Sequence, residues 1–449
     1  MRRTIRDTLI SARELAATAG PFVLLALALL AGAYYVLKPT PPKRVVIATG
    51  SEQGAYATFG ARYREELKRY GIEVVVRQTN GSRENLRLLR DPKEDVQIAF
   101  IQGGSSEVGR PPEEDAKGVP LMSLGSMFFE PVWLFYRAEA AKKAKDGALA
   151  EIADFRGLRV GVGPRGSGIP GVVSRLLAAN LMERDDIQRK YLDLVPAVIA
   201  LLNGELDALA MVSAPESPLV QMLIQTPNVR LFEFRQAEAY ARRYAFLSPV
   251  TLSRGVVDLS RNVPPRDVQL VASTASLVAR EDLHPALVQL FVQAASRIHA
   301  GGSWVSPPGK FPTPLNTEFP LARDAERYYR TGPPLLQRYL PFWLANLIDR
   351  MWVALFSIIA ILIPVARILP PLYSFRIRSR IFRWYRNLRQ IEHDLAEKTV
   401  PPEQLLEQLE KLDARAEGVM VPLAYTDELY RLRTHIGLVR QKLRTAKSS

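Results

Sequence analysis

The chain has 449 residues, of which 47% are hydrophobic and 24% charged, so it carries ample apolar material for a globular core and is not a disordered protein. It contains no cysteine, which excludes disulfides and thiolate metal sites, and its four histidines (His284, His299, His393 and His435) lack HExxH spacing. A formal net charge of +14 is compatible with nucleic acid, but no recognition motif accompanies the charge, and we expect no nucleic-acid partner.

The first apolar segment follows a basic N-terminus. Residues 1–20 carry four arginines, and residues 21–37 then run without a charge, which is just long enough to cross a bilayer. We favour an uncleaved transmembrane helix because the apolar run continues through Tyr34 and Tyr35, a residue type common at membrane interfaces. Ala31-Gly32-Ala33 resembles a signal-peptidase site, so a signal peptide covering residues 1–33 is the alternative.

A proline-rich spacer over residues 38–43 leads into two consecutive strand-loop-helix patterns. The first predicts a strand over 45–48 and a helix over 55–70, separated by the loop Thr49 to Gly54. The second predicts a strand over 73–76 and a helix over 83–90, with Ser82 as its N-cap. A third strand is expected over 96–101.

The remainder of the region 43–340 alternates strands and helices, as a parallel-sheet protein requires. Residues 120–137 are expected as two extended segments broken at Glu130-Pro131, where the chain crosses into a second lobe. The chain then predicts a strand at 159–162, a glycine loop at 163–168 and a helix at 171–181. A strand at 206–212 and a helix capped by Ser217 follow, and then a returning strand at 268–278 and a helix at 285–300.

In an open parallel sheet, such loops gather at the carboxyl ends of the strands, and each helix start offers unpaired N–H groups and a partial positive charge. We therefore expect helix starts from both lobes to face one cleft that binds a carboxylate.

A second apolar segment and a basic tail complete the chain. Residues 342–366 predict a second transmembrane helix, with a buried core helix as the alternative. Seven arginines lie between residues 367 and 389, just beyond this segment. Because positively charged residues flank both apolar segments on their outer sides, both termini are expected in the cytoplasm and residues 43–340 on the opposite side.

The tail shows heptad spacing of apolar residues in three stretches, over 377–395, 405–419 and 429–443. Pro401-Pro402 and the segment 418–422 separate these stretches. We expect an antiparallel three-helix bundle within residues 367–449, although self-association between chains would use the same pattern.

Several of these motifs, taken together and in order, resemble one family. They are Ala48-Thr49-Gly50 with Gly54-Ala55-Tyr56, then Thr79 to Leu86 before Ala99 to Gln102, then Gly161-Val162-Gly163 with Gly166-Ser167-Gly168. Over about residues 44–300 the chain is similar to the TAXI solute receptors of TRAP transporters. The resemblance implies an α/β, two-lobed type II periplasmic-binding-protein fold that closes on a small organic acid or acidic amino acid, which separate permease subunits then move. It implies neither catalysis nor a cofactor.

Two features depart from that family. The loop Gly50-Ser51-Glu52-Gln53-Gly54-Ala55 stands where the family has a glycine-rich loop, so Glu52 is predicted to face the ligand and to hold an ammonium group. The second apolar segment and the tail bundle are also additions. They favour an integral membrane protein, of the inner membrane with its binding domain in the periplasm, that senses a solute or docks beside one permease.

The expected arrangement is a cytoplasmic N-terminus (1–20), a transmembrane helix (21–37), a solute-binding domain (43–340), a second transmembrane helix (342–366) and a cytoplasmic bundle (367–449). Within the binding domain, lobe 1 covers about 43–135 and 250–300, and lobe 2 about 136–249. The predicted ligand-contact residues are Gly50, Ser51, Glu52, Gln53, Tyr56, Thr79, Asn80, Gly81, Ser82, Asn85, Gln102, Glu130, Arg165, Gly166, Ser167, Gly168 and Ser213.

Local structure offers a second interpretation of these residues, because Ser, Thr, Asn and Gly also favour caps and turns. Gly161 to Gly166 spells GxGxxG, but a lone match without a ribose-binding acid is weak support for a dinucleotide. Two other functions remain open: an enzyme on the same two-lobed fold, and a ligand-free scaffold that acts through its tail.

Overall fold

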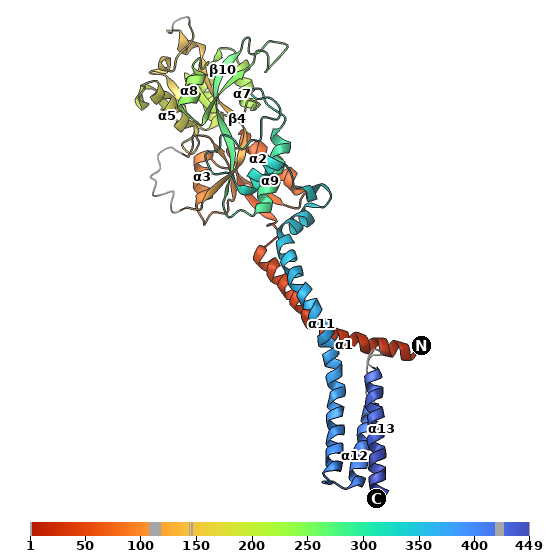
Figure 1. Ribbon diagram of the computed structural model, residues 1–449. Helices are drawn as coiled ribbons and strands as arrows, with labels where there is room; N and C mark the ends of the chain where they lie inside the picture. The colour runs from red at the N-terminus through yellow and green to blue at the C-terminus, as the bar shows by residue number, and fades with distance from the viewer. Residues whose placement is uncertain (1, 107–117, 143, 145–146, 418–425, 449) are drawn as a thin grey trace. The chain divides into compact units, whose positions relative to one another are not determined.

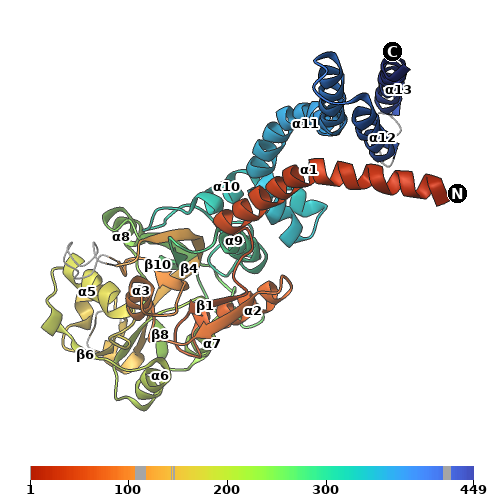
Figure 2. The same cartoon turned by 90° about the horizontal axis from the view of Figure 1, so that it is seen from below.

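The computed structural model describes residues 2–106, 118–142, 144, 147–417 and 426–448. The chain divides into two compact units, Thr40–Asn346 and Met1–Pro39 with Leu347–Ser449. The first unit is a two-lobed α/β domain. In Figure 1, α2, α3 and α9 lie around one lobe and α5, α7 and α8 around the other, and Figure 2 shows the same lobes from below.

One lobe is built from the start of the domain and from its end. Its strands are β1 (Arg44–Ala48), β2 (Glu73–Arg77) and β3 (Ile98–Gln102), with the first part of β4 (Leu121–Arg137) and the last part of β10 (Val268–Arg280). Its helices are α2 (Ala55–Lys68), α3 (Ser82–Arg90), α9 (Pro285–His299), α10 (Arg323–Thr331) and η5 (Leu335–Arg338). β1 pairs in parallel with β2 and β3, as the sequence predicts.

The other lobe is built from the middle of the domain. Its strands are β5 (Arg159–Gly161), β6 (Gln188–Lys190), β7 (Ala208–Val212), β8 (Val229–Leu231) and β9 (Leu247–Leu252). Its helices are α5 (Ile169–Ala179), α6 (Leu194–Asn203), α7 (Pro218–Gln225) and α8 (Ala237–Arg243), with the short η1 (Ala138–Ala141), η3 (Ile152–Phe155) and η4 (Arg184–Asp186). β5 pairs in parallel with β6 and β7.

Two long strands, β4 and β10, connect the lobes. The strand order is β2-β1-β3-β10-β4-β7-β5-β6. β10 is antiparallel to both β3 and β4, so the parallel pairs within each lobe are joined into one mixed sheet. The predicted return of the chain along 268–278 is confirmed. The expected break at Glu130-Pro131 is wrong, because β4 runs through it without interruption. Pro131 is the last residue of β4 that pairs with β10, and from Val132 onward β4 pairs with β7. Proline has no backbone N–H to donate, and it lies at the point where the hydrogen-bonded partner strand changes.

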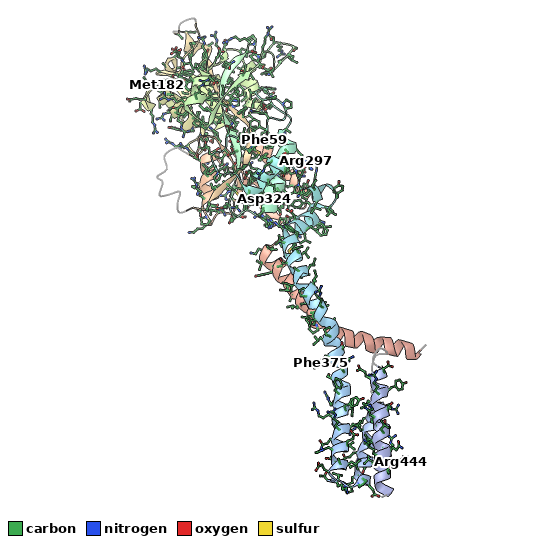
Figure 3. All side chains as sticks on the ribbon, viewed as in Figure 1. Phe59, Met182, Arg297, Asp324, Phe375 and Arg444 are labelled. Atoms are coloured by element: carbon green, nitrogen blue, oxygen red, sulfur yellow. The ribbon has the colours of Figure 1, made fainter. Side chains whose placement is uncertain are left out.

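Each lobe has its own apolar core. The first lobe buries Tyr63, Phe100, Phe128 and Phe291 in one cluster, and the second buries Phe129, Trp133 and Met182 (Figure 3) in another. The change of cluster falls between Phe128 and Phe129, earlier in β4 than the expected lobe boundary near residue 135. Neighbouring residues of one strand therefore belong to different lobes.

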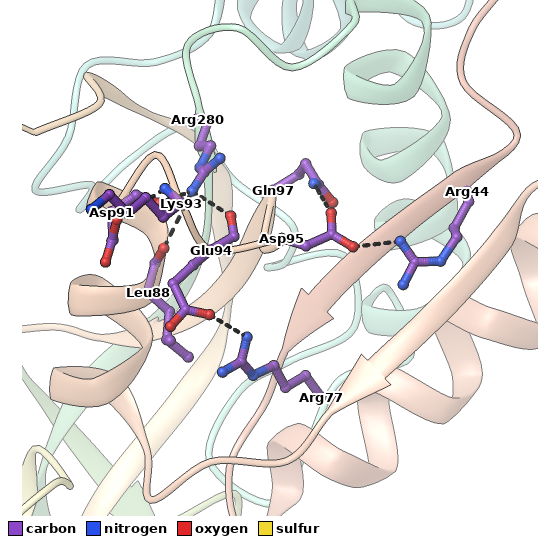
Figure 4. Close-up of polar contacts among 9 residues, drawn as sticks. All are labelled: Arg44, Arg77, Leu88, Asp91, Lys93, Glu94, Asp95, Gln97 and Arg280. Atoms are coloured by element: carbon purple, nitrogen blue, oxygen red, sulfur yellow. Dashed lines mark hydrogen bonds and ion pairs between the residues drawn. The ribbon is translucent and has the colours of Figure 1, made fainter.

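A buried arginine fixes the C-terminal end of α3. Arg280 is 7% exposed, and its guanidinium donates to the carbonyl oxygen of Leu89 at 2.9 Å. It also donates to the carbonyl oxygens of Glu94 (2.8 Å) and Asp91 (Figure 4). Carbonyl groups at a helix C-terminus lack intrahelical partners, so this contact satisfies them and places a cation at the negative end of the helix dipole. It also holds α3 against β10, which orients the opposite end of the helix.

The second unit contains two long apolar helices and a bundle. α1 (Arg2–Leu37) and α11 (Phe342–Ala396) each include a stretch long and apolar enough to cross a membrane, Ala19–Leu37 and Phe342–Val365. α11 continues without a break into the tail. α12 (Pro402–Glu417) and α13 (Thr426–Ser448) pack with it around a core that contains Leu388, Ile391, Leu405, Leu409, Leu412, Ala416, Leu432, Ile436, Val439 and Leu443. The expected break at 418–422 lies outside the described residues.

Candidate functional site

A small cavity lies between the two lobes. Its volume is about 110 Å³. The residues that line it are Gly50, Ser51, Gly54, Ala55, Tyr56, Asn80, Gly81, Ser82, Gln102, Glu130, Pro164, Ser167, Gly168, Ile169, Asp193, Leu194, Val212 and Ser213. Eleven of these residues are among the seventeen that the sequence predicts, namely Gly50, Ser51, Tyr56, Asn80, Gly81, Ser82, Gln102, Glu130, Ser167, Gly168 and Ser213.

Four helix starts border the cavity, and each belongs to a helix that follows a parallel strand. α2 follows β1, α3 follows β2, α5 follows β5 and α6 follows β6. The loops before α3 and α5 come from different lobes and touch: the Glu84 amide donates to the carbonyl oxygen of Gly166 at 3.3 Å. A Cβ placed on Gly81 would lie 3.3 Å from the Cα of Ser167. The two predicted loops therefore face each other, and the lobes are closed on the cavity.

Ser82 lies in the cavity wall but does not cap α3. The N-cap is Gly81, whose φ of 117° lies in a region that favours glycine. The Ser82 hydroxyl instead accepts a hydrogen bond from the backbone N–H of Gln102 at 2.8 Å, which connects the start of α3 to the end of β3. The predicted capping role of Ser82 is wrong for this reason.

Tyr56 and Glu130 form a buried hydrogen-bonded pair in the cavity wall. The Tyr56 hydroxyl donates to Glu130 Oε2 at 2.7 Å, and the Tyr56 ring stacks on Phe100 with centroids 5.1 Å apart. Glu130 is 3% exposed, and burial raises its pKa to about 8 although the bond from Tyr56 opposes the shift. At neutral pH, Glu130 is therefore a neutral acid that can also donate a hydrogen bond.

Gln102 supplies an unpaired donor. The residue is 4% exposed, and its Nε2 has no hydrogen-bond partner among the residues that the structure describes. A Cβ placed on Gly168 would lie 2.6 Å from Gln102 Oε1, so the absence of a side chain at Gly168 makes room for this amide. Leaving a buried N–H group unpaired costs about 1–3 kcal/mol, so a polar ligand that pairs with it gains binding energy.

Six predicted contact residues lie outside the cavity lining. Thr79 and Asn85 are structural: Asn85 Nδ2 donates to the carbonyl oxygens of Thr49 (2.6 Å) and Phe100 (2.9 Å), and Thr79 Oγ1 donates to Asn85 Oδ1 (2.7 Å). The Arg165 guanidinium stacks on Tyr191 at 4.2 Å, so it does not clamp a ligand in the cavity.

The other three residues have different positions. Gly166 serves the interlobe contact. Glu52 is exposed in the turn before α2, and Gln53 lines a different cavity.

The sequence reasoning missed several lining residues. Gly54, Ala55, Pro164, Ile169, Leu194 and Val212 contribute mainly backbone or apolar surface, and no chemical signal in the sequence marks them. Asp193 is different, because it is the N-cap of α6 and its side chain makes no capping bond. An aspartate directly before an apolar helical run could have revealed it. Among the residues that the structure describes, no lysine or arginine lines the cavity, so its described donors are amides, hydroxyls and neutral Glu130.

Comparison with known proteins identifies one family. The sequence pattern of the NMT1-like family matches residues 47–298, which is more than half of the chain. No curated protein matches the chain.

Solved structures with a similar chain path include two alkanesulfonate-binding proteins. SsuA from Xanthomonas axonopodis pv. citri bound to MOPS has 14% identity and a TM-score of 0.38, and the match covers 58% of this chain and 74% of that one. The periplasmic aliphatic sulphonate binding protein SsuA from Escherichia coli has 15% identity and a TM-score of 0.35, with coverage of 71% and 83%. The Synechocystis PCC6803 CcmR regulatory domain in complex with 2-PG has 14% identity and a TM-score of 0.37, with coverage of 57% and 98%.

Proposed function

The chain belongs to the NMT1-like family, and from that premise we propose that residues 40–346 form a receptor that closes around one small solute. One observation carries this proposal: a buried Gln102 amide donor, unpaired within the described residues, lines a closed cavity between two lobes. A receptor whose lobes close on a ligand leaves such groups for the ligand to satisfy.

The lining supports an anionic or zwitterionic solute. Helix starts from both lobes bring backbone N–H groups and partial positive charge to the cavity, and a carboxylate accepts from both. Neutral Glu130 can donate to the same carboxylate, whereas Asp193 can accept from an ammonium group. The proposed ligand is accordingly a small organic acid or an acidic amino acid, and Gly50, Ser51, Tyr56, Asn80, Gly81, Ser82, Gln102, Glu130, Ser167, Gly168 and Ser213 are its proposed contacts.

The two apolar helices support a place in the membrane. We propose that α1 and the first part of α11 cross the inner membrane and hold the binding domain in the periplasm, with the tail bundle in the cytoplasm. The motif likeness to TAXI receptors supports delivery to separate permease subunits or sensing beside them. This protein would be a binding component and not an enzyme.

Thermal-shift screening of the full chain in detergent tests this function. The panel is succinate, 2-oxoglutarate, L-aspartate and L-glutamate, with the corresponding amides as neutral controls. We expect at least one acid to raise the melting temperature by several degrees at a concentration about 100-fold above its Kd, since binding to the native state alone stabilises by about 2.7 kcal/mol there. No shift with any acid would favour the ligand-free scaffold, and turnover would favour an enzyme.

A further inference from the structure

A second, larger cavity lies in the same domain. Its volume is about 410 Å³, and Ala55 is the only described residue that it shares with the lining of the cavity around Gln102. Its walls come from both lobes: α2 and the end of α9 on one side, and the loop before α7 on the other. Phe59, which lines it, is labelled on α2 in Figure 3, and Arg297 of the adjacent α9 is labelled beside it.

One part of the cavity is aromatic. Phe59 and Phe128 have ring centroids 4.6 Å apart, and Phe129 and Phe311 meet edge to face at 4.9 Å. These rings form a wall suited to a flat apolar body, because aromatic groups stack on or pack edge-on to one another favourably. None of the four rings contributes to the cavity around Gln102.

The same lining holds two buried polar atoms without partners among the described residues, one of them on a ring that packs against Phe59 at 4.5 Å and Phe128 at 5.5 Å. They are Ser217 Oγ, in a residue 5% exposed, and His299 Nε2, in a residue 7% exposed. Ser217 is the N-cap of α7, yet its side chain makes no capping bond, so this helix start keeps a hydroxyl and unsatisfied amides. Burial, with a smaller contribution from Arg62, lowers the pKa of His299 to about 3, so the imidazole is neutral and its Nε2 can pair with a ligand.

Two charged side chains complete the lining. The Arg62 guanidinium lies 5.4 Å from the centroid of the Phe59 ring. The Glu216 carboxyl accepts a hydrogen bond from the Trp304 amide at 3.2 Å, and burial raises its pKa. The charge of Arg62 partly opposes this pKa shift, so it acts on Glu216 as well as on an incoming anion.

We propose that this second cavity binds an arylcarboxylate, with the aromatic ring among Phe59, Phe128 and Phe311 and the carboxylate at Ser217, the α7 start and Arg62. An aromatic body matches the ring-lined wall, and a carboxylate can accept from the hydroxyl, from helix-start amides and from a guanidinium at once. The site is separate from the cavity around Gln102 and would take a different ligand.

Calorimetric titration of the full chain in lipid nanodiscs with phenylacetate tests the proposal, with phenylacetamide as the uncharged analogue. We expect one phenylacetate site per chain and at least tenfold weaker binding of phenylacetamide. Ser217→Ala should weaken phenylacetate binding about tenfold, because a hydrogen bond to a charged group is lost. The variant should keep the wild-type melting temperature, since Ser217 Oγ has no described partner to lose.

Three further variants make the result decisive. Arg62→Gln should also weaken phenylacetate binding, whereas Ser174→Ala, which removes a hydroxyl bonded to the Pro170 carbonyl on α5, should not. Gln102→Leu, in the other cavity, should leave phenylacetate affinity unchanged. The proposal is overturned if phenylacetate does not bind, if Ser217→Ala and Arg62→Gln both bind it as tightly as the wild type, or if Gln102→Leu abolishes its binding.

Discussion

Glu130 is the ionisable residue on which the chemistry of the interlobe cavity depends most. Its ordinary pKa of 4.5 rises to about 8 on burial, so the folded protein keeps a proton that the unfolded chain releases. The free energy of unfolding therefore falls as the pH rises from about 4.5 to about 8, and this contribution is constant above that range. Since one pKa unit corresponds to about 1.4 kcal/mol, the loss is on the order of several kcal/mol.

Glu130→Gln should remove this pH dependence. Glutamine keeps an acceptor for the Tyr56 hydroxyl but carries no proton to lose, so the stability of the variant relative to the wild type should increase steadily from pH 5 to pH 8. Denaturant unfolding of both full-length chains at intervals across this range measures the effect, with Glu52→Gln as an exposed control. Parallel curves for the wild type and Glu130→Gln would show that Glu130 is ionised in the folded protein.

Asp193 is predicted to set the choice between amino acids and keto acids. It lines the cavity at the start of α6, where its carboxylate can meet a ligand ammonium group. Asp193→Asn should weaken L-glutamate binding by about tenfold, the effect of losing one charge-assisted hydrogen bond, and 2-oxoglutarate binding much less. Calorimetry with the two acids gives the ratio, and an equal effect on both would remove Asp193 from this role.

For single residues, the sequence predicted which ones line the cavity better than it predicted what their side chains do there. Glycines and serines in loops before helices identified Gly81, Ser82, Ser167 and Gly168 correctly as neighbours of one cavity, because parallel strands direct such loops to one edge. The sequence does not distinguish Asn85 from the residues that line the cavity. Its side-chain amide donates to the buried carbonyl oxygens of Thr49 and Phe100, and the same group could equally have bound a ligand. Glu52 was chosen by its place in a motif, and its exposure follows from the turn geometry, which the sequence does not reveal.

At the scale of elements, the loops before α3 and α5 close the cavity by direct contact. Gly166 is the critical position, because a Cβ there would lie 2.7 Å from the Cβ of Asn80 in the opposite lobe. This contact leaves no room for a side chain, so closure depends on glycine at this position.

Gly166→Ala should hold the lobes apart and weaken the binding of the panel acids by at least tenfold, because the two loops could no longer surround the ligand. Calorimetry of the full chain measures this effect. Gly437→Ala in α13 is the matched control, since an added Cβ there meets nothing within 4 Å. Wild-type affinity in Gly166→Ala would mean that the closed contact is not needed for binding.

Strands and helices were predictable where hydrophobic periodicity was strong. β1, α2, β2, α3 and α9 lie within two residues of their expected bounds, because each is a short apolar or amphipathic run between turn residues. β4 was not predictable as one strand, since a proline normally interrupts the hydrogen bonding between strands. Pro131 is tolerated because β4 changes its partner strand from β10 to β7 at this residue, which is a tertiary feature. The antiparallel placement of β10 between β3 and β4 depends on pairing across more than 140 residues, which local patterns do not encode.

At the scale of the whole molecule, the proposed topology separates the binding domain from the tail bundle by a membrane. The chain contains no cysteine, so single cysteines can report the side of the membrane on which each unit lies. Ser253→Cys places a thiol on an exposed residue of the binding domain, and Gln441→Cys places one on an exposed residue of α13.

In spheroplasts, a membrane-impermeant maleimide should label Ser253→Cys directly and Gln441→Cys only after lysis, because the proposed topology puts the two residues in different compartments. The cysteine-free wild type should not be labelled. Labelling of both variants in intact spheroplasts, or of neither, would contradict the two-pass topology.

The cavity around Gln102 is proposed to bind a small acid through groups that have no partner among the described residues, Gln102 Nε2 above all. Calorimetric titration of the full chain in nanodiscs with succinate, 2-oxoglutarate and L-glutamate tests it most directly, comparing the wild type with Gln102→Leu and with Gln236→Leu, an exposed control. We predict that at least one acid binds the wild type and the control with one site per chain, and binds Gln102→Leu at least tenfold more weakly. Binding of none of the three acids, or unchanged affinity in Gln102→Leu, would contradict the account.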